Sequence, residues 1–583
     1  MSAQTKAGPA EVGYRLEMPE PSNHIFHVTL TMNDLPPGEE FVDLVLPVWR
    51  PGRYVVLDFA GGVLHFEATD AGGSPLKWEK IDKTTWRVFT GGAAGFEARY
   101  RVYADEFEVR TRGLDEDHAF VDATAVFMYS EAYRHLPVRL TVKPHPGWGV
   151  TTGLEGKDTI FTSPGYDHFA DCPLEIGTQK DLDFTVRGVP HVLSIFGHAD
   201  WSTDTLIRDI TKIVEVTADF WGDMPYGRYV FMVHLAPWAG GATEHVNSTI
   251  IGGKPDRVAT PDGYLGFLST VAHEYFHTWN VKRLRPKGIV PYDYTRENYL
   301  RELWIAEGTT SYYDDLLMVR AGINTPAKYV ESRASWVSDD RRKPGNAGQS
   351  LSESSFDAWI KFSRSSPHSY NSQTDFYGKG SQVSYLLDMT IRRLTENDKS
   401  LDDVMRLMYR RFPSTGPGYT VDDMQAAASE VAGPDLSGFF EKYVHGTEPL
   451  MWEEAFSTVG ILLTAKDSTG KPWIGVSTRE SGGRTTVSTV VDGSPGRDAG
   501  LDAGDEIVAL DGKKSNGDGL KKIVSAKKPG DIIKIAIFRD DRLREAGIVV
   551  RESPVPDYRT EKVSEPTKLQ KKSYENWLGS SWE

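Results

Sequence analysis

The sequence predicts a multidomain protein in which a β-rich region, a mixed helical and β region, and a second β-rich region follow one another. The chain has 583 residues, which is too long for a single hydrophobic core. Its hydrophobic pattern has a period of two up to about residue 195, a helical period from about residue 203, and short β runs with turns from about residue 460. We therefore expect three or four domains.

The first region, residues 1–195, is predicted to form an all-β, sandwich-like domain. In "HIFHVTLTM" every second residue is apolar and falls on one face of a strand, namely Phe26, Val28, Leu30 and Met32. In "EFVDLVLPVW" the apolar residues share a face only after a shift near Val42, and they are Phe41, Leu44 and Leu46. Turn signals such as "DLPPGEE", "WRPGRY" and "DAGGSP" separate these runs.

The middle region, residues 196–455, is predicted to be α+β and mostly helical. "STDTLIRDITKIVEVTADFW" carries an apolar stripe at spacings of three and four, formed by Leu206, Ile210, Ile213, Val214 and Phe220. Two further helices are expected to begin at capping signatures, "SLDD" at Ser400 and "TVDD" at Thr420. Between the helical segments, "YVFMVHLAP" and "NSTIIGG" are typical of strands.

Composition narrows the range of partners. The formal net charge of -16 disfavours nucleic acid and anionic membranes, because both repel an acidic protein at long range. No run approaches the ~20 apolar residues that cross a bilayer, and "MSAQTKAGPAEVGYRLEMPE" lacks the apolar core of a signal peptide. We expect a cytoplasmic protein, or a periplasmic or secreted one if a signal peptide has been removed. The single cysteine, Cys172, is expected to be a small buried hydrophobe.

The stretch "VAHEYFHTWN" predicts a zinc site. His273 and His277 are four residues apart, so a helix presents both imidazoles on one face. Two neutral imidazoles and a carboxylate hold zinc tetrahedrally and leave a fourth position for water. The flanking residues are apolar, as burial of this helix requires: Val271, Ala272, Tyr275, Phe276 and Trp279. The alternative is an ordinary amphipathic helix with two polar residues.

Three glutamates compete to be the third ligand. Glu297 lies in "TRENYL", which is typical of a helix that begins after Thr295. Glu302 and Glu307 fall on the same expected helix and point ~140° apart, so only one of them can face the ion. Glu307 stands in "LWIAEGTTSYYDD", where the following glycine leaves room for an ion. We predict Glu307 as the ligand, with Glu297 as its rival.

The C-terminal region, residues 456–552, resembles a PDZ domain of the bacterial protease-associated type. The segment "SPGRDAGLDAGDEIVALDG" carries this resemblance. It implies that "WIGV", residues 473–476, is the loop whose amides bind a peptide carboxylate, and that the next strand pairs with a peptide. A domain that only packs on its neighbour is the alternative. Residues 553–583 are predicted to be a C-terminal tail.

Together, "VAHEYFHTWNVKRLRP", "DYTRENYLRELWIAEGTTSYYDDLL" and the PDZ-like region resemble the glycyl aminopeptidase family of gluzincin metallopeptidases. The resemblance implies an N-terminal β domain, a thermolysin-like catalytic domain and a C-terminal PDZ domain. It implies one Zn2+ per chain, and peptide substrates with a free N-terminus from which small residues such as glycine and alanine are removed. It also favours Glu307 over Glu297, since the carboxylate in the "AEG" context is the family's ligand.

Three further features complete the expected active site. Glu274 adjoins the first ligand and can accept the proton of the attacking water, then pass it to the leaving amine. "GGATEH" resembles the "GAMEN"-type motif of related aminopeptidases. The resemblance implies that Glu244 binds the α-ammonium of the substrate, and Gly241 and Ala242 are expected to contact the backbone of the substrate. A solvated loop glutamate is the alternative for Glu244.

"FYGKGSQVSYLL" resembles the "YEKG" segment of relatives, which implies that Tyr377 donates a hydrogen bond to the oxyanion. A packing role is the alternative for Tyr377, and Tyr370 is the nearest substitute. Two other functions remain open from the residues alone. One is a zinc endopeptidase with the same metal site and no use for Glu244, and the other is a non-catalytic PDZ adaptor on a peptidase scaffold.

Overall fold

The N-terminal region is built from β-strands. The computed structural model describes residues 11–466, 471–515 and 519–583, and the chain falls into two compact units, Met1–Tyr299 with Phe412–Gly418, and Leu300–Arg411 with Tyr419–Glu583. In the first unit a seven-stranded sheet has the order β13 (Glu155–Lys157), β14 (Ile160–Ser163), β11 (Val138–Lys143), β1 (Val12–Glu17), β2 (Ile25–Asn33), β7 (Gly95–Tyr103) and β4 (Val63–Asp70).

Two smaller sheets complete this β-rich part. One has the order β12 (Gly149–Thr152), β15 (Leu174–Gly177), β10 (His118–Val121), β9 (Arg112–Leu114) and β8 (Asp105–Glu106). The other has the order β3 (Phe41–Val45), β6 (Thr85–Phe89) and β5 (Trp78–Lys80). Cys172 is buried and free, as expected.

The period-two pattern is confirmed in β2, where Phe26, Val28, Leu30 and Met32 are all buried. The buried face predicted for the next strand, β3, is wrong at one residue. Phe41 is 39% exposed and lies under the guanidinium of Arg87. Val42 and Leu44 form the buried face instead, so the alternation runs through β3 without a shift.

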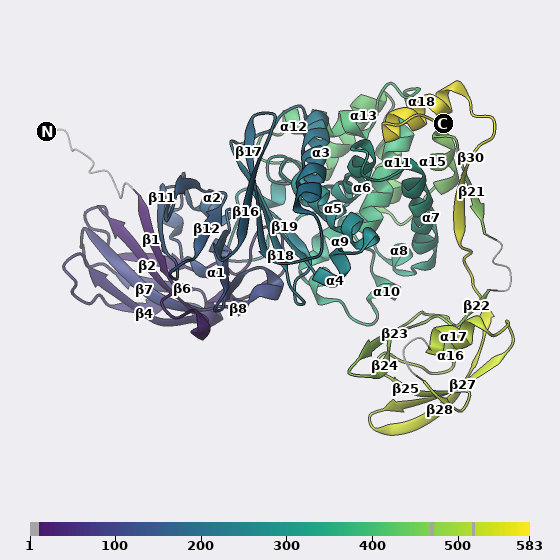
Figure 1. Cartoon of the computed structure of the whole chain (residues 1–583), viewed down its shortest axis with the longest axis horizontal. Helices are drawn as coiled ribbons and strands as arrows, with labels where there is room; N and C mark the ends of the chain where they lie inside the picture. The colour runs from purple at the N-terminus through teal and green to yellow at the C-terminus, as the bar shows by residue number, and fades with distance from the viewer. Residues whose placement is uncertain (1–10, 467–470, 516–518) are drawn as a thin grey trace. The chain divides into compact units, whose positions relative to one another are not determined.

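A five-stranded mixed sheet follows, with the order β16 (Lys180–Val186), β17 (Val189–Gly197), β18 (Tyr229–Leu235), β20 (Ser248–Gly253) and β19 (Ala242–Glu244). Strands β17, β18 and β20 are parallel, and β19 lies antiparallel at the end of the sheet. The helices α3 (Thr203–Trp221) and α5 (Pro261–Phe276) pack together beside it (Figure 1). All five predicted stripe residues of α3 are buried. The domain boundary predicted at residue 195 falls within β17, and the domain limits stay a prediction.

The second unit is mainly helical. Its longer elements are the π-helix η6 (Trp304–Thr309), α6 (Thr310–Arg320), α7 (Pro326–Arg342), α11 (Gly378–Leu394), α12 (Leu401–Arg411) and α13 (Val421–Ala432). The capping box predicted at Thr420 is present, because the side chain of Thr420 accepts from the backbone of Asp423 and the side chain of Asp423 accepts in return. At the other signature, the side chain of Asp403 accepts from the backbone N–H of Ser400 at 3.0 Å.

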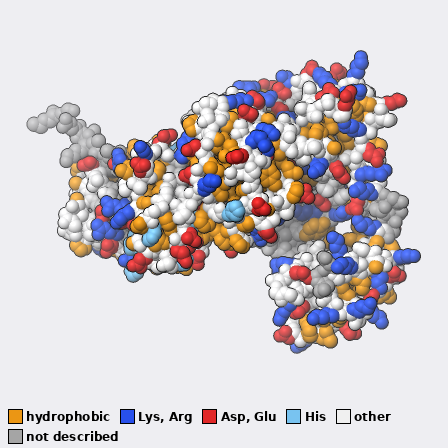
Figure 2. All heavy atoms as spheres, in the orientation of Figure 1, with side chains coloured by type: hydrophobic (Ala, Val, Ile, Leu, Met, Phe, Trp, Pro, Cys, Tyr) orange, Lys and Arg blue, Asp and Glu red, His pale blue; other side chains and the backbone are white. Residues whose placement is uncertain are grey.

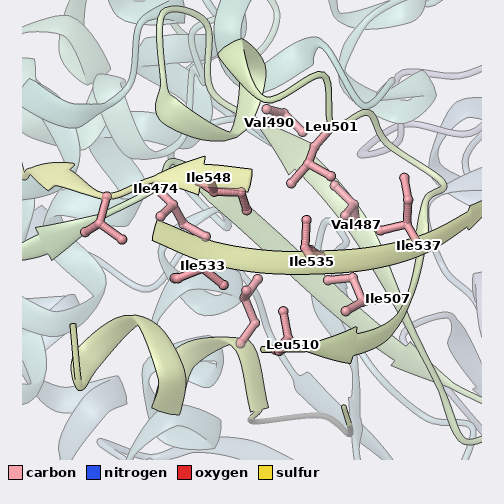
Figure 3. Close-up of a cluster of buried hydrophobic side chains, with 12 residues drawn as sticks. Ile474, Val487, Val490, Leu501, Ile507, Leu510, Ile533, Ile535, Ile537 and Ile548 are labelled. Carbon is pink, nitrogen blue, oxygen red and sulfur yellow. The ribbon is translucent and has the colours of Figure 1, made fainter. Parts of the chain in front are cut away.

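The C-terminal β domain has its own apolar core, shown in Figure 3. Its sheet has the order β23 (Val476–Ser481), β24 (Arg484–Val490), β25 (Glu506–Leu510), β27 (Ile532–Arg539) and β28 (Arg542–Val549), and β26 (Lys513–Lys514) pairs with β25. Short helices α16 (Pro495–Asp498) and α17 (Gly519–Ser525) accompany it. Strand β23, which follows the predicted carboxylate-binding loop, is the terminal strand of this sheet, so one of its edges makes no pairing within the described sheet.

Residues 553–583, predicted as a tail, hold a strand and a helix. Strand β30 (Tyr558–Lys562) pairs antiparallel with β21 (Ile461–Ala465), so the β domain lies in the chain between two paired strands (Figure 1). Helix α18 (Lys568–Leu578) then buries Trp577, whose indole N–H donates to the hydroxyl of Tyr312 at 3.0 Å. The C-terminal segment is therefore part of the second unit's core.

Charged side chains of both signs are interspersed on the face shown in Figure 2. None of the helices in the described ranges is long and apolar enough to cross a membrane.

Candidate metal centre and active site

Helix α5 presents the two predicted histidine ligands. It begins at Thr260, whose side chain accepts from the backbone N–H of Gly263, and its last residue precedes His277. The ring centroids of His273 and His277 lie 4.6 Å apart, as expected for residues one helical turn apart. The apolar residues around the motif are buried, with Tyr275 and Trp279 fully inaccessible. The end of α5 therefore lies in the core.

Hydrogen bonding fixes the tautomer of His277. Its Nδ1 lies 2.6 Å from the backbone carbonyl oxygen of Asn280 and donates to it, so Nε2 carries the lone pair that a metal needs. Ligand atoms of His273, His277 and Glu307 lie within 4.8 Å of one another. Two imidazoles and one carboxylate are the donor set of catalytic zinc sites, so these residues fit a zinc ion.

Glu307 lies in a π-helical turn and is 2% exposed. Such turns are rare and frequent at functional sites, because the wider turn redirects a side chain. The next residue, Gly308, was expected to leave room for the ion, and its surroundings show a different role. A Cβ on Gly308 would lie 2.5 Å from the carbonyl oxygen of Phe376 and 2.6 Å from Cα of Gly380. Gly308 therefore allows η6 to pack against α11, and the expectation that it makes room for an ion is wrong.

The rival glutamates are placed differently from the prediction. The helix expected after Thr295 is absent from the described residues, and Glu297 lies in irregular backbone. Glu302 precedes η6, and its carboxylate accepts from the backbone N–H of Val421 at 3.2 Å, at the start of α13. Among the described residues, the groups that can hold a metal include Glu307 but neither Glu297 nor Glu302.

Glu244 lies close to the helical motif. It ends β19, is 4% exposed, and forms a second group with Glu274 and His277 whose ligand atoms lie within 4.8 Å of one another. Because β19 ends its sheet, Gly241 and Ala242 lie where a peptide backbone can add to the edge. Gly241 has a φ of +68°, a conformation that suits glycine.

Basic groups that the sequence reasoning missed surround Glu244. The Arg50 guanidinium is 1% exposed and donates to the hydroxyl of Thr243 at 2.9 Å. Burial lowers the pKa of Arg50, and the charges of neighbouring carboxylates, Glu244 and Glu274 among them, oppose this shift. The ammonium of Lys282 lies 3.9 Å from Glu244 and 2.8 Å from Asp171. Burial would raise the pKa of Asp171, but Lys282 and His245 outweigh it and lower that pKa.

A tight turn also covers Glu244. Gly52 has a φ of +85°, and a Cβ there would lie 2.7 Å from Oε2 of Glu244. Arg50 and Gly52 belong to "WRPGRY", which the sequence identified only as a turn. No local pattern connects that turn with residue 244, because the proximity arises from tertiary packing.

Tyr377 precedes α11 and is partly exposed. Its ring stacks on Phe362 with a centroid distance of 5.4 Å, and its backbone N–H donates to the side chain of Asp375 at 3.0 Å. The substitute considered above, Tyr370, donates its hydroxyl to the backbone carbonyl of Arg342 at 3.3 Å. The hydroxyl of Tyr370 is thus engaged with the end of α7.

Comparison with known families agrees with this arrangement. Residues 13–178 match the model of the peptidase M61 N-terminal domain, residues 266–383 match that of M61 glycyl aminopeptidases, and residues 472–550 match a PDZ domain. Two of these three models describe M61 peptidases, so the chain is similar to the M61 glycyl aminopeptidase family over residues 13–178 and 266–383. The second match contains "HEYFH", Glu307 and Tyr377. The three family-model matches confirm the predicted multidomain fold and the metallopeptidase class, which sets aside the non-catalytic adaptor.

Solved structures give a second comparison. A crystal structure described as an aminopeptidase N family protein from Idiomarina loihiensis has a TM-score of 0.91 and 28% identity to this chain, and the match covers 97% of this chain and 100% of the other. An M1 zinc metallopeptidase from Deinococcus radiodurans has a TM-score of 0.48 and 14% identity, over 76% and 95% of the two chains. A search among curated proteins gave no match.

Proposed function

We propose that this metallopeptidase removes single residues, preferentially small ones, from the free N-termini of peptides. One observation carries the proposal. The buried carboxylate of Glu244 lies within 4.8 Å of ligand atoms of Glu274 and His277, so a group that can bind an ammonium lies beside the proposed base. An endopeptidase has no need for such an anchor.

Each residue then has one task. We propose one catalytic zinc per chain, held by His273, His277 and Glu307. When bound, zinc polarises the scissile carbonyl and lowers the pKa of a water. Glu274 accepts the proton of the attacking water and returns it to the leaving amine.

Three other parts of the chain orient the substrate. Glu244 pairs with the α-ammonium, and this contact fixes which peptide bond is presented. The β19 edge at Gly241 and Ala242 receives the peptide backbone. Tyr377 donates a hydrogen bond to the oxygen that becomes negative in the transition state.

The preference for small residues has two supports. The matching model describes glycyl aminopeptidases. In addition, Gly52 and Arg50 crowd the carboxylate of Glu244, which leaves little volume near the first residue of a bound peptide. We propose that glycine and alanine fit there better than leucine or phenylalanine.

The test compares peptides of identical sequence with free and acetylated N-termini. Acetylation removes the positive charge of the substrate and with it the ion pair between the substrate and the buried Glu244, which costs about 2–3 kcal/mol and thus about 10²-fold in kcat/KM. Mass spectrometry should show products shortened by one residue at a time from free peptides only. Internal cleavage of blocked peptides at comparable rates would establish an endopeptidase instead.

The variant Glu244→Gln provides the matched control, because it keeps the shape and removes the charge. It should reduce the ratio of free to blocked cleavage towards one while zinc content stays unchanged. If the ratio is unaffected, Glu244 is not the ammonium anchor. A series with glycine, alanine, leucine or phenylalanine as the first residue then tests the size preference.

A further inference from the structure

A second group of two histidines and one glutamate lies away from the active site. His118 is on β10, Glu175 on β15 and His234 on β18, and their ligand atoms lie within 4.8 Å of one another. None of them belongs to the "HEYFH" motif or has a role in the proposed reaction. All three are buried, with exposures of 0%, 1% and 1%.

Sheet pairing brings the three side chains together. Strands β10 and β15 are antiparallel neighbours in which Phe120 pairs with Glu175. Because residues two apart share a face of a strand, His118 lies diagonally beside Glu175. His234 comes from the five-stranded mixed sheet that contains β18. It lies on the same face of β18 as Met232. Met232 and Phe120 belong to one apolar cluster, so this face of β18 meets the face of β10 that carries His118. The group therefore continues the core between two sheets.

Aromatic rings enclose the group. Phe107 and Phe196 stack on the ring of His118 at centroid distances of 4.6 and 3.8 Å. Phe120 and Trp238 pack edge-on against His234 at 5.4 and 5.8 Å. An ionised carboxylate in such surroundings costs several kcal/mol unless a positive charge compensates it.

The donor atoms converge on one point. Nε2 of His234 lies 2.7 Å from Oε2 of Glu175, Nε2 of His118 lies 3.1 Å from Oε1, and the two Nε2 atoms lie 3.4 Å apart. A zinc ion with bonds of ~2.0 Å has tetrahedral ligands about 3.3 Å apart. The separations of 3.1 and 3.4 Å are close to that value and the 2.7 Å separation is shorter, so the four atoms are near enough to one another to share a single small ion.

Hydrogen bonds alone satisfy this arrangement poorly. Oε1 of Glu175 has no hydrogen-bond partner despite its proximity to His118, and neither do the buried Nδ1 atoms of His118 and His234. If both Nε2 atoms carried hydrogens, two N–H groups would face each other across 3.4 Å. If only one did, it would donate to one carboxylate oxygen and leave the other Nε2 lone pair facing the carboxylate, and if neither did, two lone pairs and a carboxylate would converge, an arrangement that a cation stabilises.

We propose that His118, Glu175 and His234 hold a second metal ion, a divalent transition metal for which zinc is the best match. Both oxygens of Glu175 face an imidazole, so the carboxylate supplies two donors and the histidines supply two. Four protein donors leave no position for water, which is the mark of a structural site. The ion joins two sheets and takes no part in peptide hydrolysis.

The test is the metal content of the full-length protein, measured by mass spectrometry after removal of loosely bound ions. The wild type should carry two equivalents. The double variant His273→Ala/His277→Ala should keep one, and Glu175→Gln should also carry one. Combining all three substitutions should leave none. The matched control is His191→Gln, a buried histidine of the same sheet outside any ligand group, and it should keep two.

Each result is decisive. If His273→Ala/His277→Ala carries no metal, the proposal is wrong and Glu175 simply accepts hydrogen bonds from two imidazoles. If Glu175→Gln keeps two equivalents, the ion lies elsewhere and the assignment is also wrong. Should Glu175→Gln fail to fold, the active-site double variant still answers the question. None of these measurements uses peptidase activity, so the proposed reaction can fail independently.

Discussion

The two groups of two histidines and one glutamate are assembled in different ways. His273 and His277 lie one turn apart at the end of a single helix, whereas His118 and His234 come from strands in different sheets. The first arrangement leaves a helical period in the sequence that can be read directly. The second leaves no such signal, because strand pairing brings distant residues together. Two similar sets of donor residues can thus differ completely in whether the sequence alone reveals them.

They also differ in what surrounds them. Beside His277 lie two carboxylates, Glu244 and Glu274, and the terminal strand β19, so polar groups and an edge are available to a substrate. Around His118 there are aromatic rings instead. We infer that the helical site is built for chemistry and the strand-built site for stability. The predictions below test that contrast, beginning with the largest effect.

Removal of the third ligand should have the largest effect. Glu307→Ala should lose one metal equivalent and reduce kcat/KM by at least about 10³-fold, because two imidazoles alone do not hold zinc in a catalytic geometry. Glu297→Ala is the matched control and should keep both metal and activity, since Glu297 is outside the metal-binding groups. Metal analysis and a peptidase assay on both variants give the answer. The opposite pattern would make Glu297 the ligand.

Glu274→Gln should lower kcat by at least ~10²-fold with metal content unchanged. The amide preserves the shape of the side chain but cannot accept a proton from water. Steady-state kinetics together with metal analysis separates this effect from loss of zinc. A near-normal kcat would remove Glu274 from the reaction.

Tyr377→Phe should reduce kcat by about 10-fold or more with little change in KM. A donor to the oxyanion acts mainly on the transition state, so its loss falls on kcat. Tyr370→Phe is the control and should be close to wild type, because the Tyr370 hydroxyl is bonded to the Arg342 backbone. An effect confined to KM would leave Tyr377 with a packing role only.

Local periodicity explains what the sequence predicted well. The buried face of β2, the stripe of α3 and the cap at Thr420 all follow from spacings within one element. The "HEYFH" pair is of the same kind. These features depend on the geometry of one strand or helix, so a single segment contains all the required information.

Tertiary packing explains the failures. Gly308 was interpreted as space for an ion, but the space is filled by the backbone of α11. Likewise, the turn at Arg50 and Gly52 gave no hint that it covers Glu244. The second histidine group belongs to this class as well, since its members lie on three separate strands. In each case the partner is distant in sequence, and no spacing rule connects the two.

The smallest effect on catalysis, and the clearest on stability, is expected from Glu175→Gln. This variant should keep the wild-type kcat, because Glu175 touches neither substrate nor the proposed base. Its Tm at pH 7 should be several °C lower than that of the wild type. The difference should also depend on pH in a defined direction. Burial would raise the pKa of Glu175, but His234 and His118 lower it to about 2, below the ordinary value of 4.5, so ionisation of Glu175 stabilises the fold above about pH 5.

That stabilisation is lost as the pH falls from about 5 towards 2, because the carboxylate must then bind a proton in the folded state. Release of a bound metal by acid acts in the same direction. The Tm difference between wild type and Glu175→Gln should therefore shrink on acidification, as measured by calorimetry at several pH values. Glu155→Gln, on an exposed strand, is the control and should change little at any pH. A Tm difference that stays constant between pH 7 and pH 3 would mean that Glu175 is not ionised in the folded protein. The stabilising role inferred for the group of His118, Glu175 and His234 would then be wrong.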